Sequence, residues 1–399
     1  MIERINNHLI KFYPSSSLLE SKDKIPRSLN KNSSIGAGNK YLFYKYNGTI
    51  SGIKREENFT NRDQTFLENL INELDKLNIS TINDYYYDIL IEKAFDMSIV
   101  KYIFKENELH FLKLFEKIYF WRNKTYEGSS VNLGIEIELE EKDKGEKVNI
   151  LEIFEEDYIA PIGDGVNTFI KTDKNGIISG MGVYEKEDKN AFIPIRFSNI
   201  SKKPKSQFII LTRLGDIMIV ENSQLKFAKK GNYWVEYNHQ KLTSRLTAFS
   251  NIEENSLKNS IYLSCIDVSF AKTGGLISII GDDSNFTLTQ IVDSDSLNEP
   301  KYIEKIRFFN ELTKQKSFQS LERQIRKEIL AIDGGLILSS SGKIISIGTI
   351  VKLPGGSSGG GRTAAAKELS KLGIAIKISN DGYIQLFRKG ISNEVLRII

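Results

Sequence analysis

The sequence has few cysteines and histidines, and this shortage excludes several kinds of site. A single cysteine, Cys265, excludes an internal disulfide and a thiolate zinc site, and it is typical of a reducing compartment. The three histidines are His8, His110 and His239, and none has a neighbour at the spacing of a metal site or a catalytic triad. We therefore expect all three to be structural.

The chain also lacks a long apolar run and an excess of one charge. No stretch approaches the roughly 20 apolar residues of a transmembrane helix, and the N-terminus has no signal-peptide pattern. The 55 Lys and Arg residues are nearly balanced by 51 Asp and Glu residues, so no general field attracts nucleic acid or anionic lipid. We expect a cytoplasmic protein with neither a nucleic acid nor a membrane as partner. A length of 399 residues with 40% apolar content suffices for two or three globular domains.

Changes in apolar periodicity divide the chain into three predicted domains, 1–128, 129–252 and 253–399, with an α+β fold overall. Up to about residue 62 the pattern is irregular and predicts little core, except for a hairpin with Asn47-Gly48 at its turn. Helical spacing follows as far as Trp121, with Asp63 as the predicted cap. The first domain should therefore be mainly helical, whereas the strand periods of the second predict an antiparallel sheet.

The third domain alternates helix and strand patterns. An amphipathic helix at 257–271 precedes the strand GGLISIIG, and a second helix, marked by Phe318, Leu321, Ile325 and Ile329, precedes the hairpin DGGLILSSSGKIISIGTIV. A glycine-rich loop, a last helix and two strands complete the order. This order predicts an α/β domain with a mixed sheet flanked by helices. The glycine loop would open at the crevice where a strand is followed by a helix.

That loop, LPGGSSGGGRTAAAKELSKLG at 353–373, is the sharpest local signal. Glycines that run into a helix collect unpaired N–H groups at the positive end of the helix dipole, where a phosphate can bind. Arg362 is poorly placed there unless an anion lies nearby, and Gly361 should adopt a conformation open chiefly to glycine. The match of GSSGGGRT to a phosphate-loop motif is coincidental, since Arg362 replaces the lysine. The alternative is a flexible surface loop before a helix.

Four short motifs resemble the diadenylate cyclase (DAC) domain family. Asp333-Gly334-Gly335 is similar to the family's Asp-Gly-Ala motif, and the triplet Gly360-Gly361-Arg362 takes the place of its Arg-His-Arg motif at a helix start. Asn380-Asp381-Gly382 matches its acidic turn after a strand, and Gly274-Gly275 matches the start of its leading strand. The resemblance covers residues 257–390, about a third of the chain.

This sequence differs from the family's motifs at some positions, and these differences decide which function the resemblance implies. In the family the aspartate helps hold a metal and activate a ribose hydroxyl, the Arg-His-Arg motif binds the triphosphate, and two ATP-loaded domains face each other. Two of the three side chains of the Arg-His-Arg motif, which stabilise the phosphate charge, are absent here. Their loss should greatly lower the rate of catalysis but should not prevent ligand binding. The loop is most similar to that of DACNV-type sensor domains. The resemblance therefore implies a bacterial nucleotide-binding sensor in cyclic dinucleotide signalling or defence, without catalytic residue, metal or cofactor.

The prediction assigns ten residues to a nucleotide or a nucleotide-derived molecule: Asp333, Gly334, Gly335, Gly359, Gly360, Gly361, Arg362, Thr363, Gly274 and Gly275. Asp333 and Asp381 could instead be turn residues, Thr363 a helix-start hydroxyl, and Lys272 a helix-terminal cation.

Two alternative functions stay open. One is an active diadenylate cyclase with Mg²⁺ or Mn²⁺ on a catalytic Asp333, in which Lys352, Lys377 or a partner protomer supplies the missing charge. The other is a scaffold with no ligand. A homo-oligomer or an effector protein would be the macromolecular partner.

Overall fold

The computed structural model describes residues 1–77, 84–104, 108–138, 148–154, 156, 162–185, 188–202, 206–281, 292, 303–353, 360–388 and 396–397. These residues have the expected α+β fold. They form two compact units, one of Met1–Ile193 and Phe197–Tyr237, the other of Pro194–Arg196 and Asn238–Ile399. None of the helices in this described part of the chain is both long and apolar enough to span a membrane.

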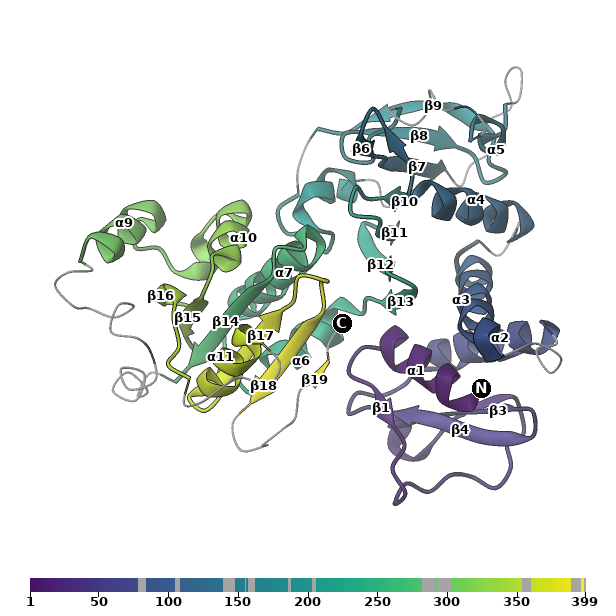
Figure 1. Ribbon diagram of the computed structural model, residues 1–399, viewed down its shortest axis with the longest axis horizontal. Helices are drawn as coiled ribbons and strands as arrows, with labels where there is room; N and C mark the ends of the chain where they lie inside the picture. The colour runs from purple at the N-terminus through teal and green to yellow at the C-terminus, as the bar shows by residue number, and fades with distance from the viewer. Residues whose placement is uncertain are drawn as a thin grey trace. The chain divides into compact units, whose positions relative to one another are not determined.

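The N-terminal unit begins with helices and a small antiparallel sheet of order β1-β4-β3-β2 (Figure 1). Its elements are α1 (Ile2–Phe12), β1 (Ser17–Leu18), β2 (Ser33–Ile35), β3 (Tyr41–Tyr46), β4 (Thr49–Lys54), α2 (Asn61–Lys76), α3 (Tyr87–Ile103) and α4 (Glu108–Trp121). The predicted hairpin turn is confirmed, because Asn47 and Gly48 both have positive φ, 46° and 77°. The predicted cap of α2 is wrong by three residues. Thr60 is the N-cap, and Asp63 completes its capping box from the N3 position.

The expectation of little core before residue 62 is also wrong. Ile5, Leu9 and Phe12 of α1 are buried, as are Leu42 and Ile53 of the hairpin. The segment looked irregular because its strands are short and are separated by polar turns, although both strands of the hairpin place apolar side chains in the core.

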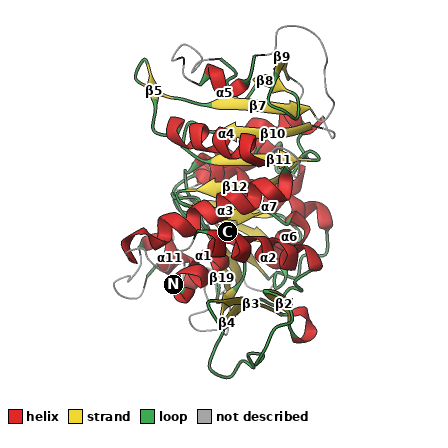
Figure 2. Cartoon of the chain, turned by 90° about the vertical axis from the view of Figure 1, so that its right-hand side faces the viewer, coloured by secondary structure: helices red, strands yellow, loops and turns green. Residues whose placement is uncertain are grey.

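A seven-stranded sheet of order β13-β12-β11-β10-β7-β8-β9 makes up the rest of this unit, and its middle strands lie side by side in Figure 2. The elements are β5 (Thr125–Tyr126), β6 (Ser129–Ser130), β7 (Leu133–Glu138), α5 (Ile150–Ile153), β8 (Thr168–Thr172), β9 (Ile178–Val183), β10 (Ser206–Leu211), β11 (Ile217–Glu221), β12 (Gln224–Lys230) and β13 (Tyr233–Glu236). The prediction of an antiparallel sheet is correct except at one pair, since β7 and β8 are parallel. The segment 139–167 between them is long enough for the crossover that a parallel pair needs.

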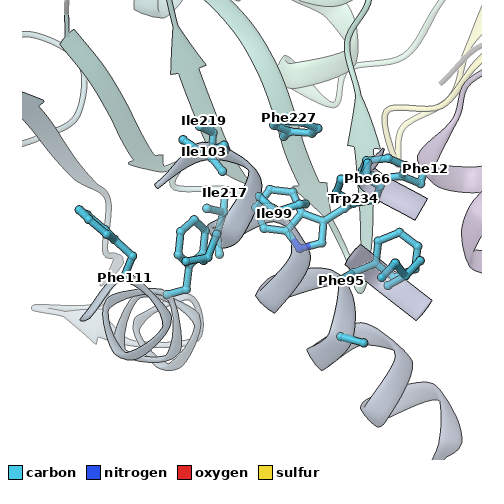
Figure 3. Close-up of a cluster of buried hydrophobic side chains, with 14 of the residues drawn as sticks. Phe12, Phe66, Phe95, Ile99, Ile103, Phe111, Ile217, Ile219, Phe227 and Trp234 are labelled. Atoms are coloured by element: carbon cyan, nitrogen blue, oxygen red, sulfur yellow. The ribbon is translucent and has the colours of Figure 1, made fainter. Parts of the chain in front are cut away.

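The helices and the large sheet share one buried core, shown in Figure 3. Phe12 of α1 stacks on Phe66 of α2 at a centroid distance of 4.3 Å, and on Phe227 of β12 at 6.0 Å. Phe115 of α4 lies 5.9 Å from Trp234 of β13. The regions that the sequence divides near residue 128 therefore form one unit, because the helices cover an apolar face of the sheet.

The C-terminal unit, green to yellow in Figure 1, has a six-stranded sheet of order β16-β15-β14-β17-β18-β19. Its elements are α6 (His239–Thr247), α7 (Asn255–Ala271), β14 (Gly275–Ile280), α9 (Ile303–Thr313), α10 (Arg323–Ala331), β15 (Gly335–Ser339), β16 (Ile344–Thr349), α11 (Gly361–Leu369), β17 (Gly373–Ile378), β18 (Ile384–Arg388) and β19 (Leu396–Arg397). Among the described strands of this sheet, only β14 and β15 pair in parallel. Helix α11 packs on the face that carries Leu276, and α10 packs on the opposite face at Gly275. The predicted mixed sheet flanked by helices is confirmed.

The second predicted helix of this unit starts later than expected. Phe318 belongs to a short 3₁₀ turn, Leu321 is extended, and α10 begins at Arg323. Ile325 is 38% exposed, whereas Arg323 is buried. In α10 the charged side chain of Arg323 is therefore buried, whereas periodicity predicted that Ile325 would be.

Arg323 forms a buried ion pair with Asp267 of α7. Its Nε and Nη2 each donate a hydrogen bond of 2.7 Å to the carboxylate, and both side chains are 0% exposed. The backbone N–H of Ile195 donates a further bond of 2.8 Å to Asp267 Oδ1, which fixes residues 194–196 in this unit. Burial raises the pKa of Asp267, and the charge of Arg323 opposes this shift.

Candidate functional site

One edge of the six-stranded sheet brings together most of the residues that the sequence assigns to a binding site. The parallel strands β14 and β15 both start at this edge, after Gly274 and Asp333-Gly334. Strand β17 ends there, since it pairs antiparallel to β14, with Ile378 opposite Gly275. The start of α11 lies at the same edge, where Arg362 contacts the turn after β17. Gly359 and the rest of 354–359 lie outside the described residues.

Arg362 is the centre of this arrangement. Its Nη1 donates a hydrogen bond of 2.8 Å to Oδ1 of Asn380, in the turn after β17. Its Nη2 lies 4.0 Å from Oδ1 of Asp333, and the two side chains are 30% and 96% exposed. An ion pair this long and this exposed contributes little energy. The guanidinium is therefore held in place by a neutral amide and keeps most of its capacity to bind an anion.

Gly274 provides the space that the side chains of Arg362 and Asn380 occupy. Its φ is 71°, and a Cβ there would lie 2.1 Å from Nη1 of Arg362 and 2.3 Å from Oδ1 of Asn380. Gly275 has a different role, because a Cβ at this position would lie 2.7 Å from the carbonyl oxygen of Leu330 in α10. The two adjacent glycines thus serve the site and the helix packing respectively.

Gly334 and Gly335 differ in a similar way. Gly334 has a φ of 97°, and its Cβ would lie 2.6 Å from the backbone carbon of Gly348. At Gly335 the nearest atom to a Cβ would be a Leu276 methyl carbon at 3.5 Å, an ordinary contact distance. An alanine would therefore fit at Gly335 without a rearrangement of the backbone.

Helix α11 begins without a side-chain cap. Gly360 is the N-cap residue, with a φ of 86°, and its carbonyl accepts hydrogen bonds from the N–H groups of Thr363 and Ala364 at 3.1 Å and 3.2 Å. The expectation that Gly361 needs a glycine conformation is wrong. It lies in the helix, and no described atom lies within 4 Å of the position of its Cβ. Gly360 takes that conformation instead, one residue earlier.

Lys377 is a second cation at the start of α11. It projects from β17, is half-buried, and its Nζ donates hydrogen bonds to Thr363 Oγ1 at 2.8 Å and Gln385 Oε1 at 3.2 Å. The sequence suggested Lys377 only as a substitute charge for an active cyclase, and it placed Asn380 only within the acidic turn. The one available signal for both was their position at the end of a strand that follows the glycine-loop helix.

Two residues with alternative interpretations have local structural roles. Asp381 accepts hydrogen bonds from the Ser379 hydroxyl and from the N–H of Tyr383, so it organises the turn. Lys272 is the C-cap residue of α7, with a φ of 54°.

A metal centre does not fit these residues. Asp333 is a single carboxylate, 96% exposed, and Nη2 of Arg362 lies 4.0 Å from it. Within the described ranges, His, Cys, Asp and Glu side chains do not form a group of three that could hold a metal ion. The residues present at this edge are suited to binding an anion rather than a cation.

Comparisons with known proteins add little to this geometry. No family model matches the chain, and no curated protein matches it. Among solved structures, a double cysteine mutant of DacA from Staphylococcus aureus matches it at 15% sequence identity with a TM-score of 0.24, covering 41% of this chain and 89% of that chain. A TM-score this low carries no argument about fold or function, so the interpretation of the site depends on its own residues.

Proposed function

We propose that the C-terminal unit binds a nucleotide or a nucleotide-derived molecule through its phosphate and acts as a sensor rather than as an enzyme. The observation that carries this proposal is the position of Arg362. Its guanidinium lies at the first turn of a helix without a side-chain cap, and among the described residues its ion-pair partner is Asp333, 4.0 Å away and almost fully exposed.

The helix dipole explains why this position suits an anion. The first turn of an α-helix carries unpaired N–H groups and a partial positive charge. A cation there is therefore unfavourable unless a negative group lies close to the cation and to the helix start. A phosphate could accept hydrogen bonds from the backbone and from the planar guanidinium together. Gly274 makes room for the guanidinium of Arg362, and the space beside Gly360 is open, since a Cβ there would meet no described atom within 4 Å.

The same residues argue against efficient catalysis. Nucleotidyl transfer requires several cations to stabilise the charge that develops on the phosphates, and each missing donor lowers the rate by about 10²-fold or more. Gly360 and Gly361 supply no side chain, and Asp333 belongs to no metal-binding group among the described residues. The N-terminal unit would then relay or receive the signal.

A nucleotide screen followed by one substitution tests the binding. We expect at least one of AMP, ADP, ATP and cyclic di-AMP to raise the melting temperature at millimolar concentration, because a ligand that binds only the folded state stabilises it. Arg362→Ala should weaken binding of that nucleotide by about 1.5–3 kcal/mol, the value of a charge-assisted hydrogen bond. Titration calorimetry measures this change.

The matched control is Lys367→Ala, which removes an exposed cation from the last turn of the same helix and should leave the affinity unchanged. Equal affinity of Arg362→Ala and the unmodified protein would contradict the phosphate site. A screen without any hit would favour a scaffold.

A second experiment separates the sensor from the enzyme. The purified protein, incubated with ATP and either Mg²⁺ or Mn²⁺, should form no cyclic di-AMP above trace amounts, because the cations and the metal ligands for the reaction are too few. Chromatography of the reaction mixture provides the measurement. Accumulation of cyclic di-AMP that is lost in Asp333→Asn would establish the cyclase instead.

A further inference from the structure

We propose that Lys377 makes the same site select ligands with two neighbouring anionic groups over ligands with one. The inference rests on the function proposed above and extends it to a specificity-determining residue. Lys377 comes from β17 rather than from the glycine loop, and it contacts α11 at Thr363.

Among the described residues, no carboxylate pairs with the charge of Lys377. In the described part of the chain both acceptors, Thr363 Oγ1 and Gln385 Oε1, are neutral. Lys229, a buried lysine of the N-terminal unit, is instead paired with Glu92 at 2.8 Å and Asp96 at 2.9 Å. Removing a charge from water is unfavourable unless it is paired, so the half-buried ammonium of Lys377 favours an anion beside it.

Its hydrogen-bonding capacity leads to the same conclusion. An ammonium group has three donors, and the two neutral acceptors occupy two of them. The third donor is left for solvent or for a ligand. Thr363 therefore orients Lys377 without using up its capacity to bind.

Arg362 and Lys377 approach the first turn of α11 from different directions. Arg362 and the Lys377 acceptor Thr363 are consecutive residues, about 100° apart around the helix axis. The end of β17 fixes both cations, since it carries Lys377 and leads into Asn380, the partner of Arg362. One phosphate held by Arg362 and the helix N–H groups leaves Lys377 unused, whereas a second, adjacent anionic group can reach it.

Calorimetric titration of two matched pairs of probes tests this inference: inorganic phosphate against pyrophosphate, and AMP against ADP. We expect the second member of each pair to bind about 10-fold more tightly or better, because it gains one charge-assisted hydrogen bond. Lys377→Gln should remove most of this preference, and Lys377→Arg should retain it. Lys367→Gln, the same change at the exposed far end of α11, should leave the preference unchanged.

The outcomes distinguish this inference from the proposed function. A preference that persists in Lys377→Gln, or equal binding of both members of each pair, overturns the role of Lys377, while Arg362-dependent nucleotide binding would still support the sensor. The absence of any nucleotide binding overturns both. Thr363→Val, which deletes the hydroxyl that orients Lys377, provides a second variant and should reduce the preference even if Lys377→Gln folds poorly.

Discussion

Asp267→Ala is expected to lower the free energy of unfolding of the C-terminal unit by about 3–5 kcal/mol, the usual effect of removing one partner from a buried ion pair. The substitution leaves the guanidinium of Arg323 buried and uncompensated, since both side chains are 0% exposed. It also removes the acceptor of the Ile195 N–H. The loss should exceed that of removing an exposed ion pair by several-fold.

The only cysteine of the chain offers a measurement confined to this unit. Cys265 lies in α7, is fully buried, and burial raises the pKa of its thiol, so it should not react with a thiol reagent until the helix is exposed. The rate of Cys265 labelling as a function of urea therefore reports the unfolding of the C-terminal unit, and Asp267→Ala should move the labelling midpoint to much lower urea.

Two further variants define what Asp267 contributes. Lys371→Ala, which breaks an exposed ion pair with Glu368 in the same unit, should leave the labelling midpoint unchanged. The double variant Asp267→Leu with Arg323→Met should recover part of the lost stability, because no unpaired charge stays buried. A midpoint for Asp267→Ala equal to that of the unmodified protein would show that the ion pair does not hold α7 and α10 together.

Gly334→Ala should lower the free energy of unfolding by about 2–4 kcal/mol, because it combines backbone strain at positive φ with overpacking. The φ of Gly334 is 97°, and the new methyl group would lie 2.6 Å from the backbone of Gly348, which cannot move aside as a flexible side chain could. Urea titration with the Cys265 readout measures this effect in the same unit.

Gly335→Ala is the matched control, one residue further along the chain. Its methyl group would find its nearest neighbour at 3.5 Å, and its φ is not positive. Stability should be unchanged or higher by up to about 1 kcal/mol, since alanine reduces the freedom of the unfolded chain. Equal effects of the two substitutions would contradict the distinct roles that the structure gives these glycines.

The order of elements in the C-terminal unit could be predicted from the sequence because it depends on local properties. The strand GGLISIIG is a short continuous apolar run, and the predicted helix at 257–271 corresponds to α7, Asn255–Ala271. The Asn47-Gly48 turn follows from the backbone conformations open to those two residues. The glycine loop can be predicted for the same reason, because it is a local signal of a helix start.

The partners in the site could not be predicted in this way. Arg362 meets Asn380, 18 residues later, and Thr363 meets Lys377, 14 residues later, because β17 pairs antiparallel to β14 and ends at the edge where α11 begins. Periodicity likewise assigned Ile325 to the core, whereas the presence of Asp267, 56 residues before Arg323, makes the arginine the buried residue.

The sequence by itself thus determined the fold class, the element order and the presence of a glycine-rich helix start, since backbone preference and apolar periodicity act over a few residues. Only the tertiary structure decided which charges share the site, which glycine is required at each turn, and that the first two regions form one unit. These outcomes depend on strand pairing and on packing between segments that are distant in sequence. The free energy of burying a charge or a Cβ depends on the atoms around it, and those atoms belong to residues far away in the sequence.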